Sequence, residues 1–97
     1  MDRVCLHVLV TGRVQGVGFR QWTADACRRR GISGWVRNLM NGQVEAMLEG
    51  PEAEVERMVA RLREGPPAAR VTSVRDWRED VQGLRDFRIL PTGEAGD

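Results

Sequence analysis

Apolar residues alternate near the start of the chain and then recur with helical spacing. From Val4 to Val10 every even position is valine or leucine, which predicts a strand with one apolar face. From Phe19 to Cys27 the apolar residues are spaced i, i+3, i+4, i+7 and i+8, as on one face of a helix. Gly31 follows as a natural helix end, so we expect a strand, a loop and then a helix.

Two further strand-like runs, 34–40 and 43–49, flank the dipeptide Asn41-Gly42. This dipeptide between two apolar runs is a strong signal for a hairpin with a two-residue turn, in which both central residues adopt positive φ. The sequence therefore predicts an antiparallel hairpin centred on this dipeptide.

A second amphipathic helix is predicted to open at Gly50-Pro51 and to stop at 65–67, where the sequence is Gly-Pro-Pro. Residues 71–77 and 87–89 read as two more strands, the second of them short. The apolar stripe of this second helix consists of Val55, Met58, Val59 and Leu62.

The predicted order is strand, helix, strand, strand, helix, strand and a short last strand. This order is typical of the α+β class and of the ferredoxin-like, or split βαβ, sandwich, with a mostly antiparallel sheet and two helices on one face. We expect one domain over residues 1–90 and a flexible polar tail over 91–97. Because this fold carries many unrelated activities, function must come from particular residues.

Charge and composition exclude several classes of protein. Fifteen basic residues, all of them arginine, nearly cancel fourteen acidic ones, so the net charge of +1 argues against a dedicated nucleic-acid binder. The sequence holds neither an apolar run long enough to span a bilayer nor a signal-peptide pattern, and we expect a cytoplasmic protein that binds no membrane. One histidine and two cysteines fall short of four zinc ligands, so we expect no metal site.

A glycine-rich segment between the first strand and the first helix is the main candidate for chemistry. Residues 12–18 hold three glycines, and Arg20 follows at the start of the helix. Backbone N–H groups of such a loop can converge on an anion, and arginine offers a planar fork for two phosphate oxygens. A tight turn with an incidental surface arginine is the competing interpretation. His7 lies in mid-strand and Cys27 on the apolar helix face, and we expect both to be structural.

Two stretches resemble the signatures of the acylphosphatase family. Residues 12–20 (Gly-Arg-Val-Gln-Gly-Val-Gly-Phe-Arg) are similar to its first signature. Residues 34–38 (Gly-Trp-Val-Arg-Asn), continuing through Gly42, Val44 and Gly50, resemble its second. The resemblance extends to Leu90 and implies the same ferredoxin-like fold.

The resemblance implies metal-independent hydrolysis of acyl phosphates to a carboxylate and inorganic phosphate, with no cofactor. It also implies that Asn38 orients the attacking water and that Arg20 binds the phosphate. The backbone N–H groups expected to bind phosphate with Arg20 belong to Gln15, Gly16, Val17, Gly18, Phe19 and Arg20 itself. A carboxylate whose conjugate acid has a pKa of roughly 4 can leave without a general acid, so the lack of a catalytic histidine is no obstacle.

Two alternatives remain open at this point. The chain could be a non-catalytic anion-binding or regulatory module, because domains resembling acylphosphatase also occur within larger carbamoyl-transfer maturation proteins. A sheet that stacks RNA bases is the other alternative, but three tryptophans, two phenylalanines and no tyrosine argue against it. We expect a free-standing monomeric enzyme, since the sequence starts at Met1 and ends soon after Leu90.

Overall fold

The computed structural model describes residues 2–95 and confirms the predicted order of elements. Seven helices and strands follow one another in this part of the chain. They are β1 (Arg3–Arg13), α1 (Phe19–Arg29), β2 (Ser33–Asn38), β3 (Val44–Pro51), α2 (Glu52–Glu64), β4 (Arg70–Glu79) and β5 (Phe87–Ile89).

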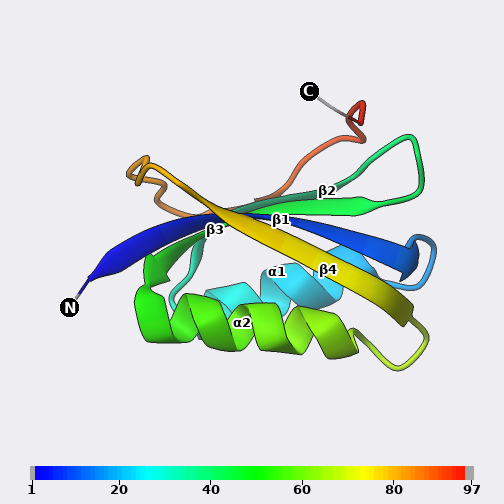
Figure 1. Cartoon of the computed structure of the whole chain (residues 1–97), viewed down its shortest axis with the longest axis horizontal. Helices are drawn as coiled ribbons and strands as arrows, with labels where there is room; N and C mark the ends of the chain where they lie inside the picture. The colour runs from blue at the N-terminus through cyan, green and yellow to red at the C-terminus, as the bar shows by residue number, and fades with distance from the viewer. Residues whose placement is uncertain (1, 96–97) are drawn as a thin grey trace.

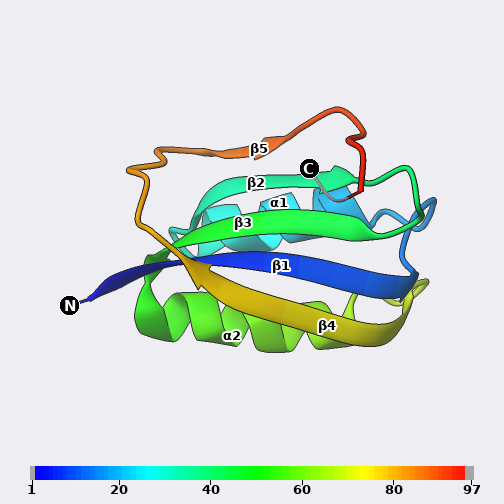
Figure 2. The ribbon, with the colours of Figure 1, turned by 45° about the horizontal axis from the view of Figure 1, so that its top comes forward.

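The five strands form one sheet in the order β4-β1-β3-β2-β5, and every pairing is antiparallel except that of β2 with β5. Both helices cover the same face of this sheet (Figure 1). The turned view places β5 and β4 at its two edges, with β3 near the middle (Figure 2). The predicted ferredoxin-like α+β sandwich is therefore confirmed.

The core lies between the sheet and the two helices. The even positions of β1 face the helices, as their alternation predicts, and the stripe of α2 is buried against them. Fully burying one valine, leucine or methionine side chain stabilises the fold by roughly 1.5–3 kcal/mol. The fully buried core side chains include Val8, Val10, Phe19, Cys27, Val36, Val44, Leu48, Val55, Met58 and Leu62.

β1 and β4 are both longer than the strands predicted over residues 4–10 and 71–77. β1 continues past Val10 to Arg13, where it pairs with Arg70, although its register shifts between Thr11 and Gly12. The polar residues at this end carry no apolar alternation, so their strand conformation comes from backbone pairing alone.

The β2–β3 connection differs from the predicted two-residue turn. Gly42 has a φ of 96°, but Asn41 does not have a positive φ, so the expectation for Asn41 is wrong. The N–H of Leu39 donates to Gln43 O at 2.8 Å, and that of Gly42 donates to Leu39 O at 3.1 Å. Pairing thus ends at Leu39 and Gln43, and in a three-residue loop of this kind only the last residue needs the left-handed conformation.

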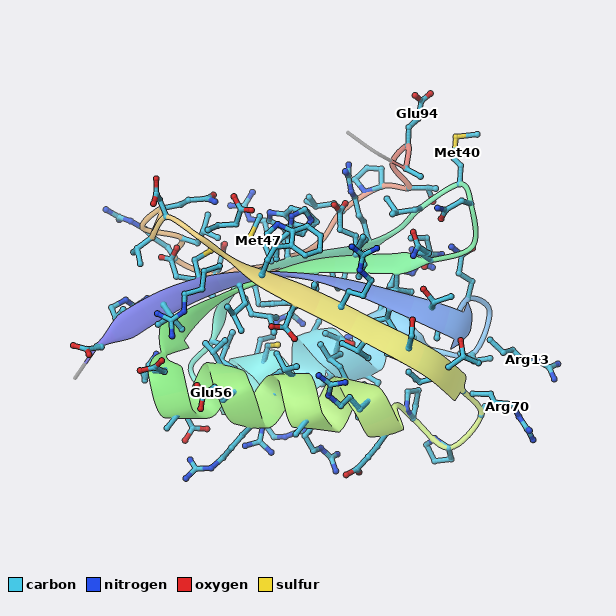
Figure 3. All side chains as sticks on the ribbon, in the orientation of Figure 1. Arg13, Met40, Met47, Glu56, Arg70 and Glu94 are labelled. Atoms are coloured by element: carbon cyan, nitrogen blue, oxygen red, sulfur yellow. The ribbon has the colours of Figure 1, made fainter. Side chains whose placement is uncertain are left out.

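After β5 the chain turns back toward the β2–β3 connection. The N–H of Gly93 donates to Asn38 O, and the N–H of Met40 donates to Gly93 O, both at 2.9 Å. Met40 and Glu94 accordingly lie at the same end of the molecule in Figure 3. The predicted tail of residues 91–97 is described as far as Ala95, and residues 96 and 97 lie outside the described part.

Candidate functional site

The loop from β1 into α1 has a backbone that glycine makes possible. Gly16 and Gly18 have φ values of 73° and 77°, in the left-handed region that other residues rarely adopt. Gly18 is also the N-cap of α1, and no side chain caps this helix end. The loop therefore leaves the first N–H groups of the helix free of local acceptors.

The free N–H groups of this segment extend over residues 16–21. None of them donates to a backbone or side-chain acceptor within residues 2–95, and the first helical bond runs from Trp22 N–H to Gly18 O at 3.0 Å. Unpaired N–H groups at a helix start carry a partial positive charge and suit an anion. The segment that the sequence predicts to bind phosphate thus carries unpaired N–H groups of a kind that suits an anion.

Arg20 and Asn38 line one cavity of about 220 Å³ with this loop. Arg20 is half-buried, and its guanidinium makes no hydrogen bond or ion pair with the described residues. An arginine without an internal acceptor keeps its whole donor fork for a ligand. The cavity is lined by Val14, Gly16, Gly18, Phe19, Arg20, Gln21, Asn38 and Ile89.

Asn38 is the last residue of β2, which brings its side chain to the mouth of the loop. Its Oδ1 atom is buried and has no hydrogen-bond partner in the described part of the chain. A buried polar atom without a partner costs free energy, and such atoms tend to occur where a ligand or water completes the site. Asn38 therefore offers a hydrogen-bond acceptor to whatever enters the cavity.

Gln15 and Val17 do not line this cavity. The side chain of Gln15 turns instead to the β2–β3 connection, where its Nε2 donates to Leu39 O at 2.7 Å and to Gln43 O at 2.8 Å. The Nε2 of Gln43 in turn donates to Thr11 Oγ1 at 2.9 Å. Gln15 thus joins the loop to the segment that follows Asn38.

Ile89 is a lining residue that the sequence did not single out. It lies on β5, next to Val36 of β2, and 37% of its surface is exposed. Its short strand carries too few residues for a readable alternation, and only the pairing with β2 places it at the cavity. The cavity is therefore lined by the apolar side chain of Ile89 as well as by the polar side chains of Arg20 and Asn38.

The other candidates for chemistry are internally paired. His7 Nε2 lies 2.6 Å from Glu45 Oε2, and Arg37 Nε donates to Glu45 Oε1 at 2.6 Å, in agreement with a structural role for His7. These three residues belong to the sheet face away from the helices. No group of three or more His, Cys, Asp or Glu side chains within residues 2–95 could hold a metal ion.

Both cysteines are buried free thiols. Burial raises the pKa of Cys27 to about 12, against a smaller opposing effect of Arg30. Burial, and then the charge of Glu49, raise the pKa of Cys5 to about 11. Because the thiolate is the reactive form, the raised pKa values argue against an activated nucleophile, and Cys27 is buried on the apolar face of α1, where the sequence placed it.

Comparison with known proteins points to one family. The family model described as Acylphosphatase matches residues 6–89. An acylphosphatase of Gloeobacter violaceus is 51% identical over 84 residues, which cover 87% of this chain and 90% of that protein. A solved acylphosphatase of Coxiella burnetii superposes with a TM-score of 0.89 at 36% identity, covering 92% of this chain and 94% of that chain.

The same fold also occurs inside a longer protein. Full-length HypF, solved in a phosphate- and nucleotide-bound form, matches with a TM-score of 0.90 at 25% identity, over 98% of this chain but 13% of that chain. No helix within residues 2–95 is long and apolar enough to cross a membrane.

Because the family model spans most of the sequence and the Gloeobacter protein matches over nine-tenths of its length, the chain belongs to the acylphosphatase family, whose enzymes hydrolyse acyl phosphates.

Proposed function

We propose that Arg20 and the loop bind the phosphoryl group of an acyl phosphate, and that Asn38 orients the water that attacks it. The observation that carries this proposal is the shared cavity: an arginine without an internal partner, free N–H groups and an unpaired amide oxygen all border it. Each of these groups is complementary to either a phosphate oxygen or a water molecule.

The phosphoryl group is bound by a positive charge and by directed hydrogen bonds. The N–H groups of Gln15 to Arg20 are the predicted donors, and those of residues 16–20 have no acceptor in the described chain. The Arg20 guanidinium adds a permanent charge and two parallel donors, which match two phosphate oxygens. Stabilising the charge that develops on these oxygens is the main catalytic task in phosphoryl transfer.

Asn38 acts on the water rather than on the phosphate. Its Oδ1 accepts a hydrogen bond from the water and so fixes the direction of attack on phosphorus. An amide is too weak a base to remove the proton, which therefore goes to a phosphate oxygen of the substrate. The new P–O bond forms as the bond between phosphorus and the acyl oxygen breaks, and the carboxylate leaves with the electron pair.

No general acid and no metal ion are needed in this scheme. The leaving carboxylate is a weak base, since ordinary carboxyl groups have a pKa of about 4. Arg20 and the N–H groups supply the positive charge that a metal ion supplies in other phosphoryl-transfer enzymes. We therefore expect hydrolysis of benzoyl phosphate to continue undiminished in excess chelator.

The role of Asn38 can be tested by separating turnover from phosphate binding. We expect Asn38→Ala to lower kcat by on the order of 10²-fold, while the inhibition constant of inorganic phosphate changes less than about threefold. Asn41→Ala, the same substitution at the exposed tip of the β2–β3 connection, serves as the matched control. Equal losses in kcat and in phosphate inhibition would rule out a water-orienting role.

The same assay separates the enzyme from a non-catalytic anion-binding module. A module of that kind would bind inorganic phosphate but would leave benzoyl phosphate at its spontaneous rate of hydrolysis. We further propose that the protein works as a cytoplasmic monomer that binds no nucleic acid. The net charge of +1 supports the absence of nucleic-acid binding. Size-exclusion chromatography with light scattering tests the monomeric state.

A further inference from the structure

We propose that Gly93, beyond the last strand, is a positioning residue for Asn38. The inference rests on the proposed water-orienting role of Asn38 and extends it to a residue outside residues 6–89, the part that the family model matches. Its basis is the hydrogen bond from Gly93 N–H to Asn38 O at 2.9 Å.

The pairing of β2 with β3 leaves the backbone carbonyl of Asn38 without a partner on that side. Leu39 N–H donates to Gln43 O at 2.8 Å, so these two residues form a hydrogen-bonded pair of the antiparallel ladder. Such pairs alternate with non-hydrogen-bonded ones, and the next pair is Asn38 with Val44. The Asn38 carbonyl therefore points away from β3, toward the edge of the sheet at which Gly93 lies.

The regular pairing with β5 stops before it reaches Asn38. β5 ends at Ile89, and its last partner on β2 is Val36. Leu90 N–H still donates to Val36 O at 2.9 Å, after which the chain leaves the ladder and returns at Gly93. This return forms an isolated bridge with Leu39 and supplies the hydrogen bond that the strand itself does not.

Gly93 is held on both of its sides. Met40 N–H donates to its carbonyl at 2.9 Å, and the guanidinium of Arg37 lies where a side chain at position 93 would project. Arg37 is itself fixed by its hydrogen bond to Glu45 at 2.6 Å. The segment is thus docked at a defined place, and its docking fixes the backbone from which the Asn38 side chain projects into the cavity.

The direct test removes the hydrogen bond in the 97-residue chain by a substitution that, like any side chain at position 93, also displaces Arg37. Gly93→Pro deletes the N–H that donates to Asn38 O, and we expect kcat for benzoyl phosphate to fall by on the order of tenfold. The inhibition constant of inorganic phosphate should stay within about twofold, because Arg20 and the loop are not touched. This unchanged inhibition also verifies that the variant is folded at its active site.

Two matched variants separate the hydrogen bond from its surroundings. Ala95→Pro introduces the same residue where the N–H has no acceptor among the described residues, and it should keep full kcat. Gly93→Ala keeps the N–H but displaces the Arg37 side chain, so its loss should be smaller than that of Gly93→Pro. Equal losses in the two Gly93 variants would overturn the proposal, because crowding would then be the cause.

A double-mutant cycle decides whether Gly93 acts through Asn38. In the Asn38→Ala background, Gly93→Pro should cause no further loss of kcat, since the side chain to be positioned is gone. A second tenfold loss in that background, or no loss in the native background, would overturn the inference. If Asn38→Ala alone kept full kcat, the proposed function itself would fail, and the two failures are thereby distinguishable.

Discussion

At one end of the sheet, the fully buried carboxylate of Glu49 accepts N–H groups from Gln82 at 2.7 Å and Leu84 at 2.9 Å. At the other end, the buried Oδ1 of Asn38 accepts no hydrogen bond in the described chain, and the N–H groups of residues 16–21 donate none. The buried carboxylate at the first end is satisfied internally, whereas the buried amide oxygen at the second end is not.

The difference separates stability from function in this small domain. Satisfied groups at the Glu49 end fasten the connection between β4 and β5 to the sheet. At the loop end the buried Oδ1 of Asn38 costs free energy while it has no partner, and a bound water offsets this cost, while the N–H groups of the loop are available to an anion. Substitutions at the loop end should therefore change turnover, and substitutions at the Glu49 end should change stability.

The largest expected effect is that of Arg20→Lys. It keeps the charge but loses the planar fork, and we expect kcat to fall by on the order of 10²–10³ with little change in the melting temperature. Arg29→Lys, on the exposed face of the same helix, is the matched control and should keep full activity. Near-normal turnover of benzoyl phosphate by Arg20→Lys would contradict a role of the Arg20 fork in turnover.

At the other end, Glu49→Ala should lower the free energy of unfolding by about 2–4 kcal/mol. The substitution leaves two backbone N–H groups without their acceptor, and each such loss costs about 1–3 kcal/mol. Urea denaturation measures the change, and kcat at 25 °C should stay within about twofold. Glu64→Ala removes an exposed carboxylate and should cost less than about 1 kcal/mol.

Gln15→Leu sharpens the boundary between the two regions. It removes the two donors that join the loop to Leu39 and Gln43, so we expect both a stability loss of about 1–2 kcal/mol and a several-fold lower kcat. Gln82→Leu changes an exposed side chain and is the control. A loss of stability with unchanged turnover would assign Gln15 to the structural region alone.

An effect smaller than that of Glu49→Ala up to about pH 10 concerns the core thiol of Cys27. Its pKa is about 12 in the folded protein and 9.0 ordinarily, so the unfolded chain loses its proton first as the pH rises. The stabilisation that results is complete below pH 9 and is lost as the pH rises from about 9 to 12. The loss of free energy of unfolding is roughly 1–2 kcal/mol by pH 10. Urea denaturation should show a shallower decline for Cys27→Ala than for the native protein.

Sequence patterns were sufficient for the fold wherever burial dictates the pattern. The even positions of β1 and the stripe of α2 are periodic because one face of each is buried, and both were predicted correctly. The turn at Asn41 was not, because its type depends on where the ladder ends, and that is a property of pairing between strands.

The site divides in the same way. Arg20 was singled out by the glycine-rich loop before it as well as by the resemblance to family signatures, and Asn38 by the resemblance alone; both line one cavity. Ile89 and Gly93 could not be found, because each reaches the site through pairing with β2 rather than through its own sequence context. The exposed fraction of Ile89 and the hydrogen bond of Gly93 are properties of the folded chain only.

The most direct test of the account is a titration of the isotopically labelled protein with inorganic phosphate, followed by backbone amide NMR. We predict saturable shifts concentrated on the N–H groups of residues 16–20, and their loss in Arg20→Lys. Saturable shifts centred elsewhere, or shifts at this loop that persist unchanged in Arg20→Lys, would contradict it.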